Sequence, residues 1–305
     1  MNYEQLYNNI QSYSENTEAL FVASIPVFVQ QAEERIYNSV QIPALRKNVT
    51  GVMTSGNQYL SLPNDWLSNY SIAVVDATGA YTYLLNKDVN FNREEYPAPT
   101  DTGLPKYYAL FGSQISNVNE MTLITGPTPD ANYNVEMHYF YYPPTIVQGQ
   151  ITSLGVITPG ASYASGLYQN VTLTGGSGSG ATADILVVGG VINTVTVKFG
   201  GQFYKVGDTL SATIGTSGSG FSIPVTQISN STGTSWLGDN FDPVLFYGAM
   251  REAMLFMKGE QDLIGYYEQK YQEAVGMLQR LGDGLERGDA YRDGQLKLNV
   301  SGAKS

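Results

Sequence analysis

The chain has 305 residues, no cysteine, one histidine and a formal net charge of −11. Without cysteine it can hold neither disulfides nor a Cys/His zinc site, and we expect no cofactor and no metal. The acidic balance argues against a surface that grips nucleic acid, because phosphate binding relies on clustered Lys and Arg, but it lets DNA slide past.

The first forty residues are predicted to form two helices. Residues 3–12 give a short first helix, and residues 25–40 place apolar side chains at every fourth position, with Pro26 in the first turn. Glu33 and its neighbours are expected on the solvated side of this second helix. Because no basic segment followed by an apolar one stands at the N-terminus, we expect no signal peptide and a protein that folds in a cytoplasm.

Residues 45–145 favour antiparallel β-structure, since alternating β-formers are separated by Pro, Asn, Asp and Gly turns. The predicted strands are 47–53, 58–62, 71–75, 81–85, 107–111, 121–124 and 135–142. In the last strand, His138 shares the more polar face with Asn134 and Glu136. With no partner motif beside it, we interpret His138 as a half-exposed sheet histidine and not as a catalytic group.

Residues 150–229 differ from the rest of the chain in composition and carry an internal repeat. They hold 15 of the 33 glycines, and two lysines balance two aspartates. Residues 157–163 parallel 197–204, and residues 177–185 parallel 217–225, both at an offset of about forty. Each half alternates Val, Ile, Leu and Thr around glycine turns, which predicts a small all-β module of two similar halves.

The glycine-rich run at 175–180 invites comparison with a phosphate-binding loop. No Gly-Lys-Ser/Thr follows it, and strands flank it where a phosphate loop would precede a helix. We therefore predict a turn.

Residues 236–285 are predicted to hold two helices, 243–258 and 260–285, with Gly259 as the C-terminal cap of the first. Asp242 and Pro243 suit the start of the first helix. From Pro243 to Met257 the only charged residues are Arg251 and Glu252, so this helix needs cover on nearly every side. The pair requires burial with partners, either within the domain or across a subunit seam.

The second of these helices has one apolar stripe, which should face the core. The stripe consists of Leu263, Tyr267, Tyr271, Ala274, Leu278, Leu281 and Leu285. The first helix is too short to span a bilayer, and no other segment is a candidate, so no membrane partner is expected.

The predicted fold class is α+β: a helical bundle from the N- and C-terminal helices plus an antiparallel β region, with an inserted all-β module. The strands before 150 and the helices after 236 look incomplete alone. We therefore predict one core domain from 1–149 and 230–305, and a second, inserted domain from 150–229.

Three short motifs, at 59–67, 103–109 and 133–143, resemble the middle of the head-to-tail adaptor proteins of tailed bacteriophages, also called connector or gateway proteins. The resemblance is closest to the short-tailed type. Residues 236–271 resemble that family's closing helices, so the likeness covers roughly 1–149 and 230–285. The inserted module departs from the minimal adaptor and resembles glycine-rich repeats of phage structural proteins.

The resemblance implies a structural virion protein at the head–tail junction, made in the host bacterial cytoplasm. It implies a homo-oligomeric ring, usually of twelve copies, between the portal protein and the tail nozzle or fibre proteins, with double-stranded DNA passing unspecifically through the channel. The C-terminal tail would reach the portal. Its apolar anchors are Tyr291, Leu296, Leu298 and Val300.

The apolarity of 243–257 makes this stretch the predicted seam between subunits. The predicted interface residues are Phe241, Leu245, Met250, Arg251, Glu252, Met254, Tyr267 and Tyr271. Between residues 239 and 293 eleven acidic residues stand against six basic ones, which suits a channel lining only if a ring forms.

Two alternatives remain open from the sequence. The inserted module could hold fibres or surface glycan through its aromatic residues, which are Tyr163, Tyr168, Phe199, Phe203 and Tyr204. A cell-wall glycan hydrolase is the lesser alternative, because Glu94, Glu95 and Asp101 crowd one loop, although closeness in sequence does not set two carboxyls across one sugar bond. The prediction is that the protein is not an enzyme and has no catalytic residues.

Overall fold

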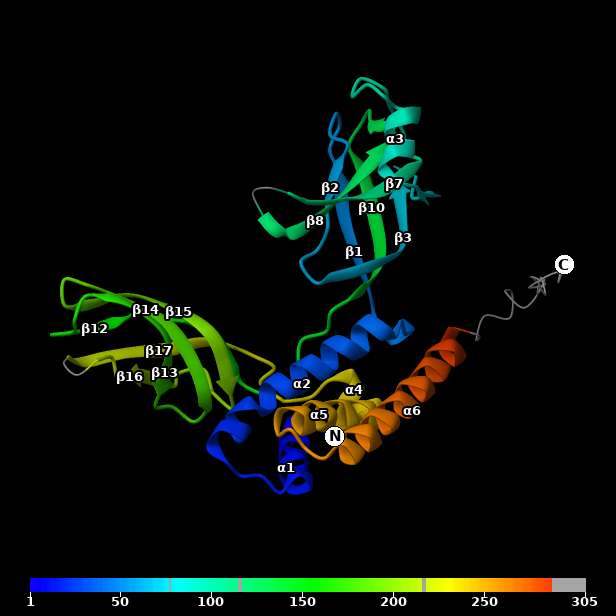
Figure 1. The fold of residues 1–305 in the computed structure, drawn as a ribbon. Coiled ribbons are helices and arrows are strands. Elements are labelled where there is room, and N and C mark those ends of the chain that lie inside the picture. The colour runs from blue at the N-terminus through cyan, green and yellow to red at the C-terminus, as the bar shows by residue number, and fades with distance from the viewer. Residues whose placement is uncertain (77, 115–116, 216–217, 287–305) are drawn as a thin grey trace. The chain divides into compact units, whose positions relative to one another are not determined.

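The computed structural model describes residues 1–286, apart from residues 77, 115–116 and 216–217 (Figure 1). The fold is α+β with an inserted all-β module, as predicted. The chain divides into two compact units, one of Met1–Val40 with Pro144–Ser305 and one of Gln41–Pro143. The predicted domain limits at 149/150 and 229/230 differ from this division and stay a prediction.

Helices from both ends of the chain pack together in the first unit. They are α1 (Tyr3–Ser14), α2 (Ala19–Ser39), α4 (Trp236–Asn240), α5 (Asp242–Phe256) and α6 (Gln261–Glu286). Helix α5 contacts α1, α2, α4 and α6, so this most apolar helix is the centre of the layer (Figure 1). Its Val244, Leu245, Ala249 and Met250 are fully buried, as the sequence pattern requires.

Two helix boundaries differ from the predicted ones. Helix α2 begins at Ala19, six residues before the predicted start, so Pro26 lies inside the helix and not in its first turn. Proline inside a helix removes one backbone hydrogen bond. The early start brings Phe21 into the core beside Ile25 and Phe28, and this burial offsets the lost bond.

The junction between α5 and α6 also differs in detail from the prediction. Lys258, and not Gly259, has the left-handed backbone (φ 53°), while the Gly259 N–H donates to the Met254 carbonyl at 3.0 Å. Gly259 therefore stands one position beyond the left-handed residue, where its N–H closes the helix end. At the start of α5, Asp242 does not cap through its side chain; Phe241 is the N-cap residue.

Glu33 of α2 is buried, contrary to the prediction that it faces solvent. Its two carboxylate oxygens accept from the Thr145 hydroxyl at 2.6 Å and from the Ile146 N–H at 2.8 Å. Residues 144–149 lead from the second unit into the β-module, and Glu33 fixes this stretch against α2. Burial raises the pKa of Glu33 to about 7, despite these two hydrogen bonds, which favour the charged form.

The second unit, Gln41–Pro143, is built from two four-stranded sheets. One sheet has the order β1 (Arg46–Met53), β10 (Tyr133–Tyr141), β3 (Trp66–Val75) and β4 (Tyr81–Tyr83), all antiparallel. The other has the order β2 (Tyr59–Ser61), β8 (Asn117–Gly126), β7 (Tyr107–Gln114) and β5 (Leu85–Asn86). All seven predicted strand segments of this region overlap observed strands.

The two sheets enclose one hydrophobic cluster, to which β10 contributes Val135, Met137 and Tyr139. These alternate with the more exposed Asn134, Glu136 and His138, as the period of two predicts. The short helix α3 (Val89–Glu95) was not predicted. Its signal is Asp88, whose side chain accepts from the Phe91 N–H at the helix start. Strands β6 (Thr102–Gly103) and β9 (Thr128–Pro129) form a further, two-stranded parallel pair.

The β-module of the first unit has seven strands. They are β11 (Gln150–Leu154), β12 (Thr158–Ala161), β13 (Gly166–Thr174), β14 (Ser179–Val188), β15 (Val191–Gln202), β16 (Thr209–Ala212) and β17 (Ser219–Ser229). The sheet order is β11-β17-β16-β13-β14-β15, with β12 on β17, and β11 also lies against β15, so the sheet nearly closes on itself. The glycine-rich run lies between β13 and β14, a turn between strands, as predicted.

The repeat predicted from the sequence is present in the backbone. Gly160 and Gly201 have φ of 64° and 65°, and the residues two positions later, Ser162 and Phe203, have 66° and 61°. Because two left-handed residues stand two positions apart in each half, the chain makes the same bend in both halves. The β12–β17 pairing of Ala161 with Ser219 correspondingly matches the β14–β15 pairing of Ser179 with Gln202.

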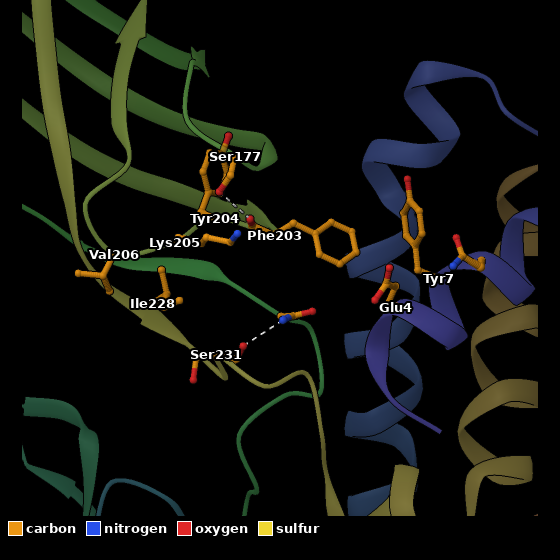
Figure 2. A pocket seen from close by; sticks show the side chains of 11 residues that line it. Glu4, Tyr7, Ser177, Phe203, Tyr204, Lys205, Val206, Ile228 and Ser231 are labelled. Carbon is orange, nitrogen blue, oxygen red and sulfur yellow. Dashed lines mark hydrogen bonds between the residues drawn. The ribbon is translucent and has the colours of Figure 1, made fainter.

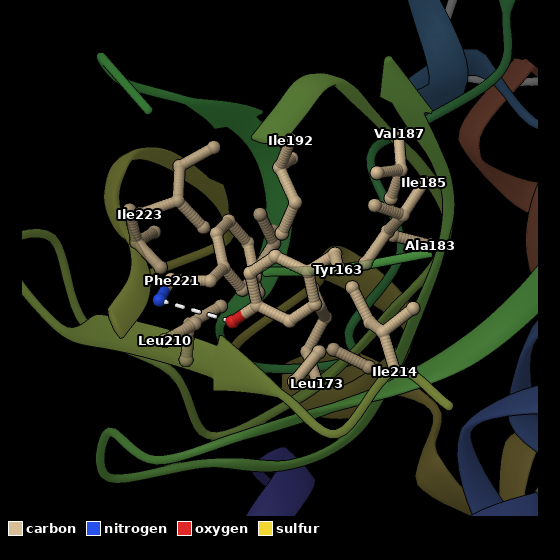
Figure 3. Close-up of a cluster of buried hydrophobic side chains, with 14 of the residues drawn as sticks. Tyr163, Leu173, Ala183, Ile185, Val187, Ile192, Leu210, Ile214, Phe221 and Ile223 are labelled. Atoms are coloured by element: carbon tan, nitrogen blue, oxygen red, sulfur yellow. Dashed lines mark hydrogen bonds between the residues drawn. The ribbon is translucent and has the colours of Figure 1, made fainter. Parts of the chain in front are cut away.

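Each half of the β-module supplies a tyrosine ring that packs on a glycine of the other half, an arrangement that we call the tyrosine exchange. The Tyr163 ring, from the first half, covers Gly218 of the second, while the Tyr204 ring, from the second half, covers Gly178 of the first. The Tyr163 hydroxyl accepts from the Phe221 N–H at 3.2 Å inside the module's hydrophobic cluster (Figure 3). This exchange ties the halves into one core of residues from within 150–229.

Candidate assembly surface

Most of the predicted interface residues are already covered within their own chain. Leu245 and Met250 are fully buried, and Met254, Tyr267 and Tyr271 are buried as well. Phe241, Arg251 and Glu252 are half-buried. Whether any of these eight residues contacts a neighbouring subunit stays a prediction, but their burial is provided by α1, α2 and α6 of the same chain.

Arg251 and Glu252 find their partners inside the chain. Arg251 donates to Glu252 at 2.7 Å and, through Nε, to Glu268 of α6. Glu252 also pairs with Arg35 of α2 at 2.8 Å. Of the two possibilities that the sequence left open for this pair, the structure shows the one within the domain: a chain of four alternating charges that joins α2, α5 and α6.

The helices nevertheless leave many large apolar side chains exposed. These are Tyr13 of α1, Leu20 of α2, Leu255 and Phe256 of α5, and Leu263, Tyr266, Met277 and Leu281 of α6. Single exposed apolar residues are ordinary, but a group of this size on one helical layer is typical of a surface that binds another protein.

On α6 the exposed apolar residues form a stripe beside the buried one. At 100° per residue, Leu263, Tyr266, Met277 and Leu281 fall within a sector of roughly 60°. Lys270, which pairs with Glu273, is the charged residue within this sector. This sector adjoins the buried positions Tyr267 and Ala274. Leu263 and Leu281 were predicted to face the core, yet they are 46% and 38% exposed. The apolar face of α6 is thus wider than α5 can cover, which is why the predicted core stripe is only partly buried.

The residues that the sequence raised for catalysis lie on β10, on α3 and in the turn after α3. His138 is bonded to Glu136 at 3.1 Å on the open face of the sheet, a half-exposed position, as predicted. Glu94 and Glu95 are exposed at the end of α3, and the Asp101 carboxylate accepts from the Ala98 N–H in a turn. Each of these groups has a structural role or faces solvent.

The five aromatic residues proposed for binding are covered to different degrees, with Tyr168 and Phe199 half-buried. Tyr163 and Tyr204 are buried, and Phe203 packs against Tyr3 and Tyr7 of α1. Near Phe203 a hollow of about 740 Å³ separates α1 from the module (Figure 2). Glu4 of α1 and Lys205 of the module are exposed and are among the residues that line it.

The remaining predictions concern a membrane span, a metal site and the C-terminal tail. No helix among the described residues is both long and apolar enough to cross a membrane. Within the same residues no group of three or more His, Asp or Glu is arranged to hold a metal ion. The predicted portal-contacting residues, Tyr291, Leu296, Leu298 and Val300, lie outside the described residues.

Comparison with known proteins adds one finding. The model of the SU10 adaptor protein family matches residues 1–173. The match runs through α1, α2, the whole second unit and the β-module as far as β13, and it ends before the C-terminal helices. No curated protein matches the chain.

Proposed function

The chain belongs to the SU10 adaptor protein family, a family of phage structural adaptors, and from this premise we propose that copies of it form a ring between the portal and the tail. In this proposal the protein is part of the virion at the head–tail junction of a short-tailed phage. The ring, of twelve copies by resemblance to other adaptors, joins the portal protein to nozzle or fibre proteins and lets DNA pass.

The observation that carries the proposal is the uncovered apolar face of the helices. A protein that exposes Tyr266, Met277 and their neighbours beside its own core has a surface suited to a second protein. Repeated contacts between unlike faces of identical copies close into a ring when the rotation between copies permits.

The negative net charge of the chain favours a channel through which DNA passes without being bound. The net charge of −11 repels a polyanion, so that a channel lined by this protein would not hold the duplex. We further propose that residues 1–149 and 230–305 act as the adaptor core, with the β-module at 150–229 inserted into it. The tail anchors Tyr291, Leu296, Leu298 and Val300 would then contact the portal.

The test is to charge the exposed stripe of α6. In the full chain, Tyr266→Lys with Met277→Lys should abolish the ring in native mass spectrometry, since burying two unpaired ammonium groups in a seam is strongly unfavourable. Val156→Lys, at a site that is 88% exposed in the β-module, is the matched control and should assemble like the wild type. Unaltered assembly of the α6 double variant, with unchanged circular dichroism, would remove this face from the interface.

A further inference from the structure

The second unit has two open sides, and each side carries the edges of both sheets. Strands β1 and β2 form one side, and β4 and β5 form the other, because the sheet orders are β1-β10-β3-β4 and β2-β8-β7-β5. Among the described residues, β1 pairs only with β10 and β4 pairs only with β3. Unpaired edges of this kind are templates for another strand.

The side formed by β1 and β2 is grooved. A hollow of about 180 Å³ opens between Val49 and Gly51 of β1, Leu60 of β2 and Leu62, the residue after β2. Val135 and Met137 of the hydrophobic cluster also line it. A Cβ placed on Gly51 would meet no atom within 4 Å, so this part of the edge is free to receive a side chain. Strand β1 is eight residues long and pairs with β10 without a register shift, so it contains neither a bulge nor a proline that would block pairing.

The side formed by β4 and β5 is ridged. Tyr81, Tyr83 and Leu85 occupy alternate positions and are 50%, 63% and 60% exposed. The two tyrosine rings are stacked, with centroids 6.4 Å apart, so the ridge is already ordered in the single chain. Tyr81 and Tyr83 lie on the same outer face of their sheet as Thr50 and the exposed Val52 of β1, because the strand pairings place Tyr83 in the row of Thr50 and Tyr81 in the row of Val52. Both edges of the sheet thus carry exposed apolar side chains on one face.

We propose that neighbouring copies join edge to edge, with β4 of one copy pairing with β1 of the next, so that the Tyr81–Tyr83 ridge lies beside Thr50 and Val52 on the outer face. The partner of each open edge is therefore a second copy of this chain. The inference deepens the proposed ring and rests on it, because it names a seam within that ring. Unlike edges that meet in this way give a head-to-tail contact, the kind that closes into rings.

Strand direction and side-chain direction both suit this contact. The sheet has four antiparallel strands, so β4 of one copy would meet β1 of the next antiparallel, and the alternation would continue from copy to copy. Thr50 pairs with Glu136, Glu136 with Ala73 and Ala73 with Tyr83, so Thr50 and Tyr83 lie on one row of the same face. The new neighbours would be aromatic and β-branched side chains, which stabilise cross-strand pairs.

Engineered disulfides test the seam, because the wild-type chain has no cysteine to compete. Thr50→Cys with Tyr83→Cys, and in parallel Val52→Cys with Tyr83→Cys, should each be made in the full chain. Directly opposed strand positions come close enough for a disulfide. Under oxidation at least one double variant should give a ladder of covalent multimers on a denaturing gel, and each single variant should give one band of monomer.

A second variant tests the ridge without cysteine. Leu85→Lys should shift the native mass from ring to single chain, with unchanged circular dichroism because Leu85 is exposed, while Val156→Lys should not. Rings that form without a ladder from either double variant, and that tolerate Leu85→Lys, would overturn this seam and leave the proposed ring standing. Disulfide dimers of the Thr50→Cys single variant would overturn the head-to-tail arrangement. Wild-type chains that remain single at every concentration would overturn both the seam and the ring.

Discussion

At the scale of single residues, Glu33 is the group whose environment departs most from what its position in the sequence suggests. Glu34 and Arg35 directly after it placed it in a polar run, and the helix period alone could not reveal that the segment 144–147 folds over it. Two donors from that segment, Thr145 and Ile146, meet its carboxylate. Contacts between residues more than a hundred positions apart are not encoded in a local pattern.

The raised pKa of Glu33 predicts a pH dependence of stability. The pKa rises from an ordinary 4.5 to about 7, so between these values the folded chain binds a proton that the unfolded chain releases. Stability should therefore fall as pH rises from about 4.5 to about 7, by about 3 kcal/mol in total from this group. Urea denaturation of the full chain across this range measures the effect.

Glu33→Gln separates this contribution from those of other groups. The amide mimics the protonated acid, because it can accept from Ile146 and donate to the Thr145 hydroxyl. In this variant the free energy of unfolding should not decrease between pH 4.5 and 7 on account of residue 33. At pH 8 the variant should therefore be more stable than the wild type. Glu34→Gln, one residue away and exposed, is the control and should behave like the wild type. If both variants kept the wild-type dependence, Glu33 would not be the titrating group.

At the scale of elements, the sequence was most informative where a pattern repeats. The strands of the second unit and the two halves of the β-module were predicted because their alternation and glycine turns are local features. Helix α3 was missed because it has only seven residues, too few to show a helical period. The α6 stripe was found, but Leu263 and Leu281 were assigned to the core, since a period shows which residues share a face and not how much of it a neighbour covers.

The exchanged tyrosines of the β-module predict the effect of two glycine substitutions. A Cβ on Gly218 would lie 2.2 Å from the Tyr163 ring, at a φ of +101°. One on Gly178 would lie 2.4 Å from the Gln202 carbonyl oxygen and 2.5 Å from the Tyr204 ring. Gly218→Ala should destabilise the module by about 2–4 kcal/mol, as overpacking and backbone strain add. Gly178→Ala should have an effect of the same order.

Denaturation followed by tyrosine fluorescence measures both changes in the full chain. Gly189→Ala is the matched control: it also has a positive φ, of 62°, but no atom lies within 4 Å of its Cβ, so only strain of about 1 kcal/mol is expected. Equal effects at Gly218 and Gly189 would mean that the tyrosine rings give way, and that the exchange does not hold the halves together.

At the scale of the whole molecule, the sequence led to the family, whereas the exposure of each side chain had to come from the structure. The order of short motifs in 59–143 indicated an adaptor, and the family match over residues 1–173 confirms that part. The predicted seam was placed on α5, where Leu245, Met250 and Met254 are buried within the chain while Leu255 and Phe256 are exposed, and that seam stays a prediction. Exposure depends on the tertiary packing of every neighbour, so the uncovered α6 stripe and the ridge at Tyr83 became visible only in the structure.

The central claim, a ring of copies on the portal, is tested most directly by electron microscopy of the purified full chain mixed with the portal protein of the same phage. We predict closed rings of identical copies seated on the portal around a central opening wide enough for duplex DNA. Single chains bound around the portal without contacting one another, or open filaments of the chain alone, would contradict the account.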